Sequence, residues 1–243
     1  MRYTFGPGGI TPAIKTLILV NVAAFLVTAL FPRITIYLGL TPLAVFERLW
    51  LWQPVSYLFL HSGLFHILFN MLALWMFGTE LERLWGTIFF TRYYFITGIG
   101  AAATTLLVSL LPFDFARPTY YAITIGASGA VYGILLAYGM YYPDRPIYMY
   151  LLFPIPAKYF VIIIGAIAFY SSLSAASGGV AHAAHLGGLV VGYLYLSRGR
   201  GGPLAELKYR YMKWKMARAR RRFDVVSGGR GSGGGWGGSG RVH

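Results

Sequence analysis

The chain has 243 residues, of which 57% are hydrophobic and only 12% are charged. Soluble globular domains carry about 25% charged residues, so this composition excludes an ordinary soluble domain and predicts a polytopic membrane protein. The absence of cysteine excludes disulfides and thiolate metal sites.

The positive charge is concentrated at the C-terminal end. The formal net charge is +14, and residues 198–243 hold 12 of the 21 Lys and Arg residues but only two acidic residues. Apolar residues interrupt the basic stretch 203–223, which fits either a helix on anionic lipid headgroups or a solvated extension. Residues 227–241 are rich in Gly and Ser and are predicted to be disordered. Because Trp236 is their only aromatic residue, no nucleic-acid partner is expected.

Six apolar runs are long enough to cross a bilayer, which takes about 17–25 mostly apolar residues. Pro and Gly residues mark the segments between them, and the first run ends without a small-x-small cleavage site, so it is expected to be retained. The sequence thus predicts an all-α bundle of six transmembrane helices over 13–197, after an N-terminal segment 1–12 and before the tail 198–243. The runs are 13–31, 54–77, 91–111, 126–142, 157–174 and 180–197.

Loop charges predict the orientation of this bundle. Six spans put both termini on one side, and with the termini inside, the inner segments carry 18 Lys and Arg residues against three in the outer loops. The positive-inside rule therefore places both termini in the cytoplasm, and we expect a multi-pass protein of the plasma (inner) membrane. Spans two, four and six then begin at the outer face.

Four polar residues are predicted to share a layer near that outer face: His66, Asn70, Ser128 and His182. An unpaired polar group in hydrocarbon costs several kcal/mol, so four such residues in one layer are not expected by chance and indicate a functional site. Ser128 lies in Gly126-Ala-Ser-Gly129 at the start of a span, where free backbone N–H groups can stabilise an oxyanion. Ser128 is either a nucleophile or a small residue at a helix contact, as the Gly129-x-x-x-Gly133 pattern also allows.

His182 is the predicted partner of Ser128. Small residues around it and Gly188-x-x-x-Gly192 after it favour close packing of the sixth span on the fourth, which would bring an imidazole to Ser128. The alternative is a histidine hydrogen-bonded at a helix contact. His185, one turn further in, is expected to be structural. Tyr132 shares the helix face of Ser128 and could orient the His182 ring.

Two features limit the chemistry of this layer. His61, His66, His182 and His185 could alternatively hold a metal, but no carboxylate is nearby and no His-Glu-x-x-His pattern occurs. The seven acidic residues all lie outside the polar layer, so a hydrolase would use a Ser-His dyad with no acidic third member. Glu82, between spans two and three, is expected to anchor its turn through hydrogen bonds or an ion pair.

Together these residues resemble the rhomboid family of intramembrane serine proteases, over roughly residues 50–197. Four patterns carry the resemblance in chain order: His61 through His66 to Asn70, the loop Gly78-x-x-x-Glu82-x-x-x-Gly86, Gly126-Ala127-Ser128-Gly129, and Ala181-His182-x-x-His185-Leu-x-Gly188.

The resemblance implies a function and a role for each residue. Ser128 would be the nucleophile, His182 its general base, Asn70, His66 and the Ser128 backbone N–H the oxyanion hole, and Tyr132 the aromatic that packs on the catalytic histidine. Segment 174–180 would form a mobile cap. The substrates would be single-span transmembrane proteins, and neither metal nor cofactor is expected.

Two other classes of function remain open from the sequence. A catalytically silent rhomboid-like protein would hold client helices, but it is expected to lack the Ser or the His. A small transporter would use the same polar cavity, but it predicts internal repeats or a charge relay, and no acidic residue occupies the interior of a span.

Overall fold

The computed structural model describes residues 8–114, 116–149, 153–172 and 179–198, and helices dominate this part of the chain. The chain divides into two compact units, residues 1–203 and 204–243. The second unit, which contains the predicted headgroup-binding and Gly-rich segments, lies outside the described residues.

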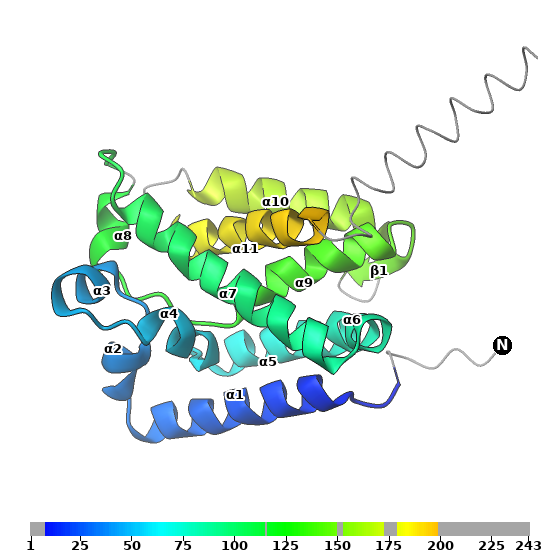
Figure 1. Ribbon diagram of the computed structural model, residues 1–243, viewed down its shortest axis with the longest axis horizontal. Coiled ribbons are helices and arrows are strands. Elements are labelled where there is room, and N and C mark those ends of the chain that lie inside the picture. The colour runs from blue at the N-terminus through cyan, green and yellow to red at the C-terminus, as the bar shows by residue number, and fades with distance from the viewer. Residues whose placement is uncertain (1–7, 115, 150–152, 173–178, 199–243) are drawn as a thin grey trace, which may run out of the picture. The chain divides into compact units, whose positions relative to one another are not determined.

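Six long helices make up most of the described part of the first unit (Figure 1). The second of them is continuous from Leu64 to Trp85 and contains a π-helical turn. They are α1 (Pro12–Leu30), α5 (Leu64–Ala73) with η2 (Leu74–Gly78) and α6 (Thr79–Trp85), α7 (Thr87–Ser109), α9 (Ser128–Tyr141), α10 (Ala157–Ser172) and α11 (Gly179–Arg198).

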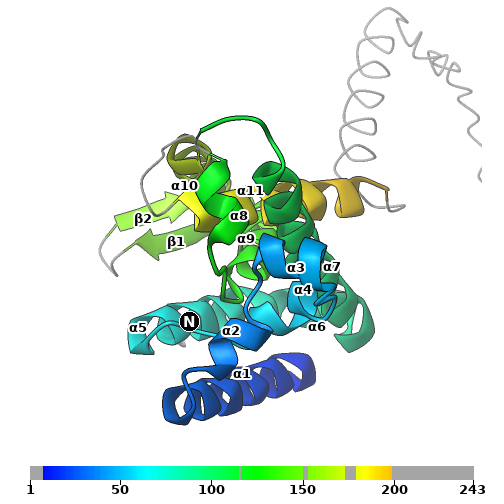
Figure 2. The ribbon, with the colours of Figure 1, turned by 90° about the vertical axis from the view of Figure 1, so that its left-hand side faces the viewer.

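Short elements connect these helices. Between α1 and α5 lie α2 (Ile34–Leu38), α3 (Pro42–Arg48), α4 (Gln53–Ser56) and the 3₁₀ turn η1 (Tyr57–Phe59), and α8 (Arg117–Tyr121) follows α7. The strands β1 (Pro146–Met149) and β2 (Phe153–Pro156) pair antiparallel, with Ile147 opposite Ile155, between α9 and α10 (Figure 2).

The six long helices occur where the apolar runs predicted helices, with one correction. The second run was expected to span 54–77, but the helix begins at Leu64 and ends at Trp85. Residues 53–59 instead fold as α4 and η1 because polar contacts hold them against the preceding connection. The Gln53 side chain accepts from Thr41 N and donates to Tyr37 O, and Ser56 Oγ donates to Leu38 O.

Two of the described helices are both long and apolar enough to cross a membrane, α1 and the continuous helix Leu64–Trp85, and α10 is apolar but shorter. The crossing of a bilayer by six helices stays a prediction.

The long helices pack in two groups that meet at α7 (Figures 1 and 2). On one side α1 contacts α5, α6 and α7, and on the other α11 contacts α7, α9 and α10. Two buried tyrosines tie the centre together: the Tyr57 hydroxyl donates to Gly98 O, and the Tyr93 hydroxyl donates to Gly133 O, both at 2.7 Å. A hydroxyl buried at this depth needs such a partner because water cannot reach it.

Glu82 joins the ends of three helices, as the sequence predicted for this turn. Glu82, on α6, is only 3% exposed. It accepts from Ala13 N at 2.9 Å and Ile14 N at 3.1 Å, both in the first turn of α1, and from the hydroxyls of Thr11 and Thr87. A carboxylate at a helix N-terminus satisfies N–H groups that have no partner within the helix. Glu82 therefore anchors α1 and the start of α7 to α6.

We predict that Glu82→Ala destabilises the fold by about 3 kcal/mol, because it leaves buried N–H and O–H donors without an acceptor. The matched control is Glu80→Ala, which removes the partner of Arg145 in a partly exposed ion pair on the same short helix and should cost less than about 1 kcal/mol. Unfolding in detergent, followed by circular dichroism, measures both. Equal losses in the two variants would contradict the anchoring role of Glu82.

Candidate functional site

Ser128 is the first residue of α9, and the chain reaches it through an extended segment. Leu40 and Thr124 form an isolated antiparallel bridge with two backbone hydrogen bonds, and Gly126 N donates to Tyr57 O at 2.9 Å. Gly126 has a φ of 124°, a conformation that L side chains rarely adopt. These contacts fix the turn into α9, so the position of the Ser128 hydroxyl is set by backbone on both sides of the connection.

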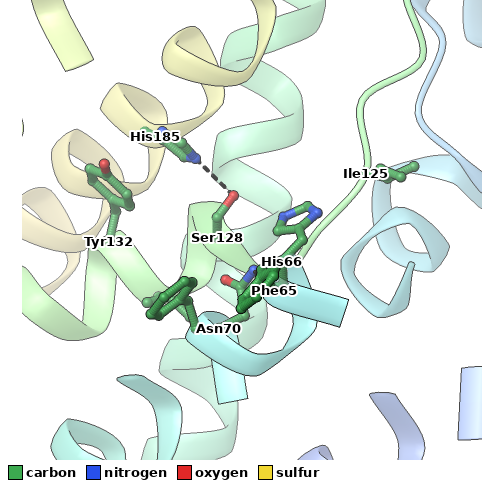
Figure 3. Close-up of a pocket in the computed structure, with 9 residues that line it drawn as sticks. Phe65, His66, Asn70, Ile125, Ser128, Tyr132 and His185 are labelled. Carbon is green, nitrogen blue, oxygen red and sulfur yellow. Dashed lines mark hydrogen bonds between the residues drawn. The ribbon is translucent and has the colours of Figure 1, made fainter. Parts of the chain in front are cut away.

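The histidine beside Ser128 is His185. Its Nε2 lies 2.8 Å from Ser128 Oγ, across 57 residues of sequence and from a different helix, α11. Figure 3 shows the two side chains pointing toward each other from α9 and α11. A hydroxyl and an imidazole nitrogen at this distance form the pair that a serine nucleophile needs.

This placement corrects the predicted pairing of Ser128 with His182. His182 lies one turn earlier on α11, and it does not line the pocket that contains Ser128. The reason is depth. α9 and α11 touch where Gly129 meets Gly188. His185, about one turn before Gly188, is close enough to that contact to reach Ser128, whereas His182 lies about two turns before it.

Tyr132 holds the ring of the histidine that contacts Ser128. The Tyr132 and His185 rings stack with centroids 4.1 Å apart and planes 4° from parallel. The sequence predicted that Tyr132 would orient an imidazole next to Ser128, and the structure brings it to His185 instead of His182. Stacking fixes the plane of the imidazole ring.

His66 and Asn70 come from α5 and face Ser128 from the other side (Figure 3). The Ser62 backbone N–H donates to His66 Nδ1 at 3.3 Å, so a neutral His66 carries its proton on Nε2. That Nε2 lies beside the Gly126 backbone, 2.8 Å from where a Cβ would be. Asn70 is buried and donates one amide hydrogen to His66 O at 2.9 Å, which leaves its second amide hydrogen for another acceptor.

These side chains line one pocket of about 420 Å³. Its walls come from α5, α9, α11 and the extended segment before α9. The lining residues are Phe65, His66, Phe69, Asn70, Ile125, Ser128, Val131, Tyr132 and His185.

Within the described ranges, no three His, Asp or Glu side chains are grouped so that they could hold a metal ion. The four-histidine alternative therefore has no matching geometry there. Most of the predicted cap, 174–180, lies outside the described residues.

Close backbone contact between α9 and α11 sets the distance between Ser128 and His185. A Cβ on Gly188 would lie 1.9 Å from Gly129 O, and a Cβ on Gly129 would lie 2.5 Å from Ala101 Cβ on α7. Such approaches are possible only without side chains, which is how small residues bring membrane helices together. The glycines that the sequence identified as a helix contact thus place the hydroxyl and the imidazole in reach.

A signal for His185 was present in the sequence. On a helix with 3.6 residues per turn, His185 lies about 60° around the axis from Gly188 and about 20° from Gly192, whereas His182 lies about 120° and about 80° from them. His185 is therefore nearer than His182 to the face of α11 that the two glycines form, and that face packs against α9.

Comparison with known proteins identifies relatives of this chain. A family model described as a rhomboid domain matches residues 48–199. The chain is 34% identical over 138 residues to "Rhomboid protein 1, mitochondrial" of Saccharomyces cerevisiae, covering 56% of this chain and 38% of that protein. It is 31% identical over 142 residues to rhomboid protease GluP of Bacillus subtilis, covering 58% and 25%. It is 32% identical over 153 residues to rhomboid protease AarA of Providencia stuartii, covering 60% and 54%.

The family model covers more than half of the chain and includes Ser128 and His185. The chain belongs to the rhomboid family. It spans between a quarter and just over half of the length of these three relatives, so their activities enter below as a proposal.

We predict that Gly188→Ala separates α9 from α11 and abolishes any activity that needs Ser128 next to His185. The added methyl group meets backbone, which cannot rotate away, and overpacking of this kind costs about 1–3 kcal/mol. Gly165→Ala on α10 is the matched control, because its Cβ would make an ordinary contact 3.4 Å from Leu189 Cδ1. Thermal unfolding and activity should change little in the control. Wild-type activity in Gly188→Ala would contradict the contact.

Proposed function

We propose that this rhomboid-family chain is an intramembrane serine endopeptidase, which hydrolyses peptide bonds in or near transmembrane segments of membrane proteins. The observation that carries the proposal is the 2.8 Å contact between Ser128 Oγ and His185 Nε2, with Tyr132 stacked on the imidazole. Three relatives with "rhomboid protease" in their names support the same reading.

In this mechanism Ser128 Oγ attacks the carbonyl carbon of the scissile peptide bond. His185 Nε2 takes the Ser128 proton and then gives it to the leaving amine. A water molecule, deprotonated by the same nitrogen, hydrolyses the acyl-enzyme and restores Ser128. No described carboxylate lines the pocket, so the catalytic pair is a dyad.

The oxyanion that forms on the carbonyl needs hydrogen-bond donors that are already in place. Three are available around Ser128: its own backbone N–H at the N-terminus of α9, the free amide hydrogen of Asn70, and Nε2–H of His66. Hydrogen bonds elsewhere fix the side chains of Asn70 and His66, and the helix backbone fixes the Ser128 N–H, so none has to reorganise during the reaction.

The proposal also includes a topology and a set of partners. Six helices cross the plasma membrane, both termini are cytoplasmic, and Ser128 lies toward the outer side. Substrates are single-span transmembrane proteins whose helix enters the bundle from the side. The charge asymmetry of the loops supports this orientation.

We predict that purified protein in liposomes cleaves a tagged single-span substrate, and that Ser128→Ala and His185→Ala each abolish cleavage. Removing either half of a nucleophile–base pair removes nearly all of its contribution, since the two act as a unit. Cleavage is measured by gel and by mass spectrometry of the product ends. Unchanged cleavage by folded Ser128→Ala would rule out the serine mechanism.

We further predict that Asn70→Ala lowers kcat about 100-fold and changes KM little, because loss of an oxyanion donor acts in the transition state. Asn21→Ala is the matched control. Asn21 is also buried, and it also donates to the carbonyl four residues earlier, but it lies on α1 and does not line the pocket. If both variants lose kcat equally, the effect is structural and Asn70 is not an oxyanion donor.

A further inference from the structure

The His185 ring has one nitrogen that the proposed mechanism leaves without a partner. Nε2 contacts Ser128, and Nδ1 is buried with no hydrogen-bond partner among the described residues. For Nε2 to accept the Ser128 proton, a neutral His185 must carry its own proton on Nδ1. A buried N–H donor without an acceptor is costly, and each such group calls for an explanation.

An acidic residue does not fill this role in the part of the chain that the structure describes. The carboxylates there are Glu47, Glu80, Glu82, Asp114 and Asp144, and none of them lines the pocket. Tyr132 holds the face of the imidazole, but a stacked ring does not offer an acceptor to the Nδ1–H at the edge. The acceptor must therefore be another group near His185.

His182 lies close to His185 and also has a ring nitrogen without a hydrogen-bond partner. It lies three residues before His185 on α11, and the two rings meet edge to face, with centroids 5.7 Å apart and planes at 81°. Its own Nδ1 is also buried without a hydrogen-bond partner among the described residues. Two imidazoles on adjacent turns thus each have an unsatisfied nitrogen, and one bridging water or a rotation of the His182 ring can join them.

We propose that His182 is a positioning residue for the dyad, which accepts the hydrogen bond from His185 Nδ1–H directly or through one water. This inference rests on the proposed function, since it gives His182 a part in the same reaction. When His185 takes the Ser128 proton on Nε2, it becomes an imidazolium, and His182 remains neutral and stabilises the Nδ1–H that now carries positive charge. No proton passes to His182, and the Nε2 proton leaves with the amine.

Two further features fit this role. Stacking on Tyr132 fixes the plane of the His185 ring but leaves the tautomer and the rotation within that plane unset, and a bond at Nδ1 sets both. His182 is also nearer than His185 to the start of α11, so a substrate that disturbs that end of the helix would alter the orientation of the base.

The test compares His182→Leu, which has no acceptor, with His182→Gln, which keeps one. We expect kcat for a single-span substrate to fall about tenfold in His182→Leu with KM nearly unchanged, because a positioning bond to the base acts on the chemical step. His182→Gln should recover most of kcat. Wild-type kcat in His182→Leu, or an equal loss in both variants, would overturn the proposal.

A second measurement needs no variant and covers the case in which His182→Leu does not fold. Nitrogen NMR of histidine-labelled wild-type protein reports which nitrogen of each ring carries the proton. We expect Nδ1 in His185 and Nε2 in His182, because His182 accepts through its unsatisfied Nδ1. A neutral His182 protonated on Nδ1 would overturn the proposal, whereas a neutral His185 protonated on Nε2 would contradict the dyad itself.

His185→Ala separates this inference from the function on which it rests. Inactive His185→Ala with fully active His182→Leu refutes only the positioning role of His182. Active His185→Ala refutes the dyad itself.

Discussion

The contact between Gly129 and Gly188 is the constraint on which the site depends. Ser128 and His185 are far apart in sequence, and only the direct approach of two helix backbones brings Oγ and Nε2 to 2.8 Å. The residues that do the packing are therefore neighbours of the residues proposed to do the chemistry. A helix pair held by large interdigitating side chains would separate the hydroxyl from the imidazole by several ångströms.

The rest of the first unit supports that contact from two directions. α7 packs against both α9 and α11, with Ala101 against Gly129 and Thr104 against Gly187. It therefore holds these two helices in their relative position. Glu82 holds the N-terminal ends of α1 and α7 against α6. The helix that contains α6 begins with α5, which carries His66 and Asn70. One continuous helix thus connects a structural anchor at one end to the proposed oxyanion donors at the other.

Much of this arrangement could be predicted from sequence, and the failures have physical causes. Apolar runs predicted six long helices. The polar layer predicted that His66, Asn70 and Ser128 share one site with His182; the pocket contains the first three, but it has His185 in place of His182. The start of the second helix was wrong because Gln53 and Ser56 bond to a preceding segment whose path the sequence does not reveal. The choice of histidine was wrong because it depends on which glycine of α11 touches α9, and His182 and His185, one turn apart, both lie among small residues.

Acylation of Ser128 by a fluorophosphonate tests the central claim most directly, since it needs a nucleophile activated by its base but no substrate helix. The measurement compares labelling rates of wild type, Ser128→Ala, His185→Ala and His182→Ala in detergent. The geometry predicts labelling of wild type, slower labelling of His182→Ala, and none of Ser128→Ala or His185→Ala. Labelling that persists in His185→Ala and disappears in folded His182→Ala would contradict the assignment of His185 as the base.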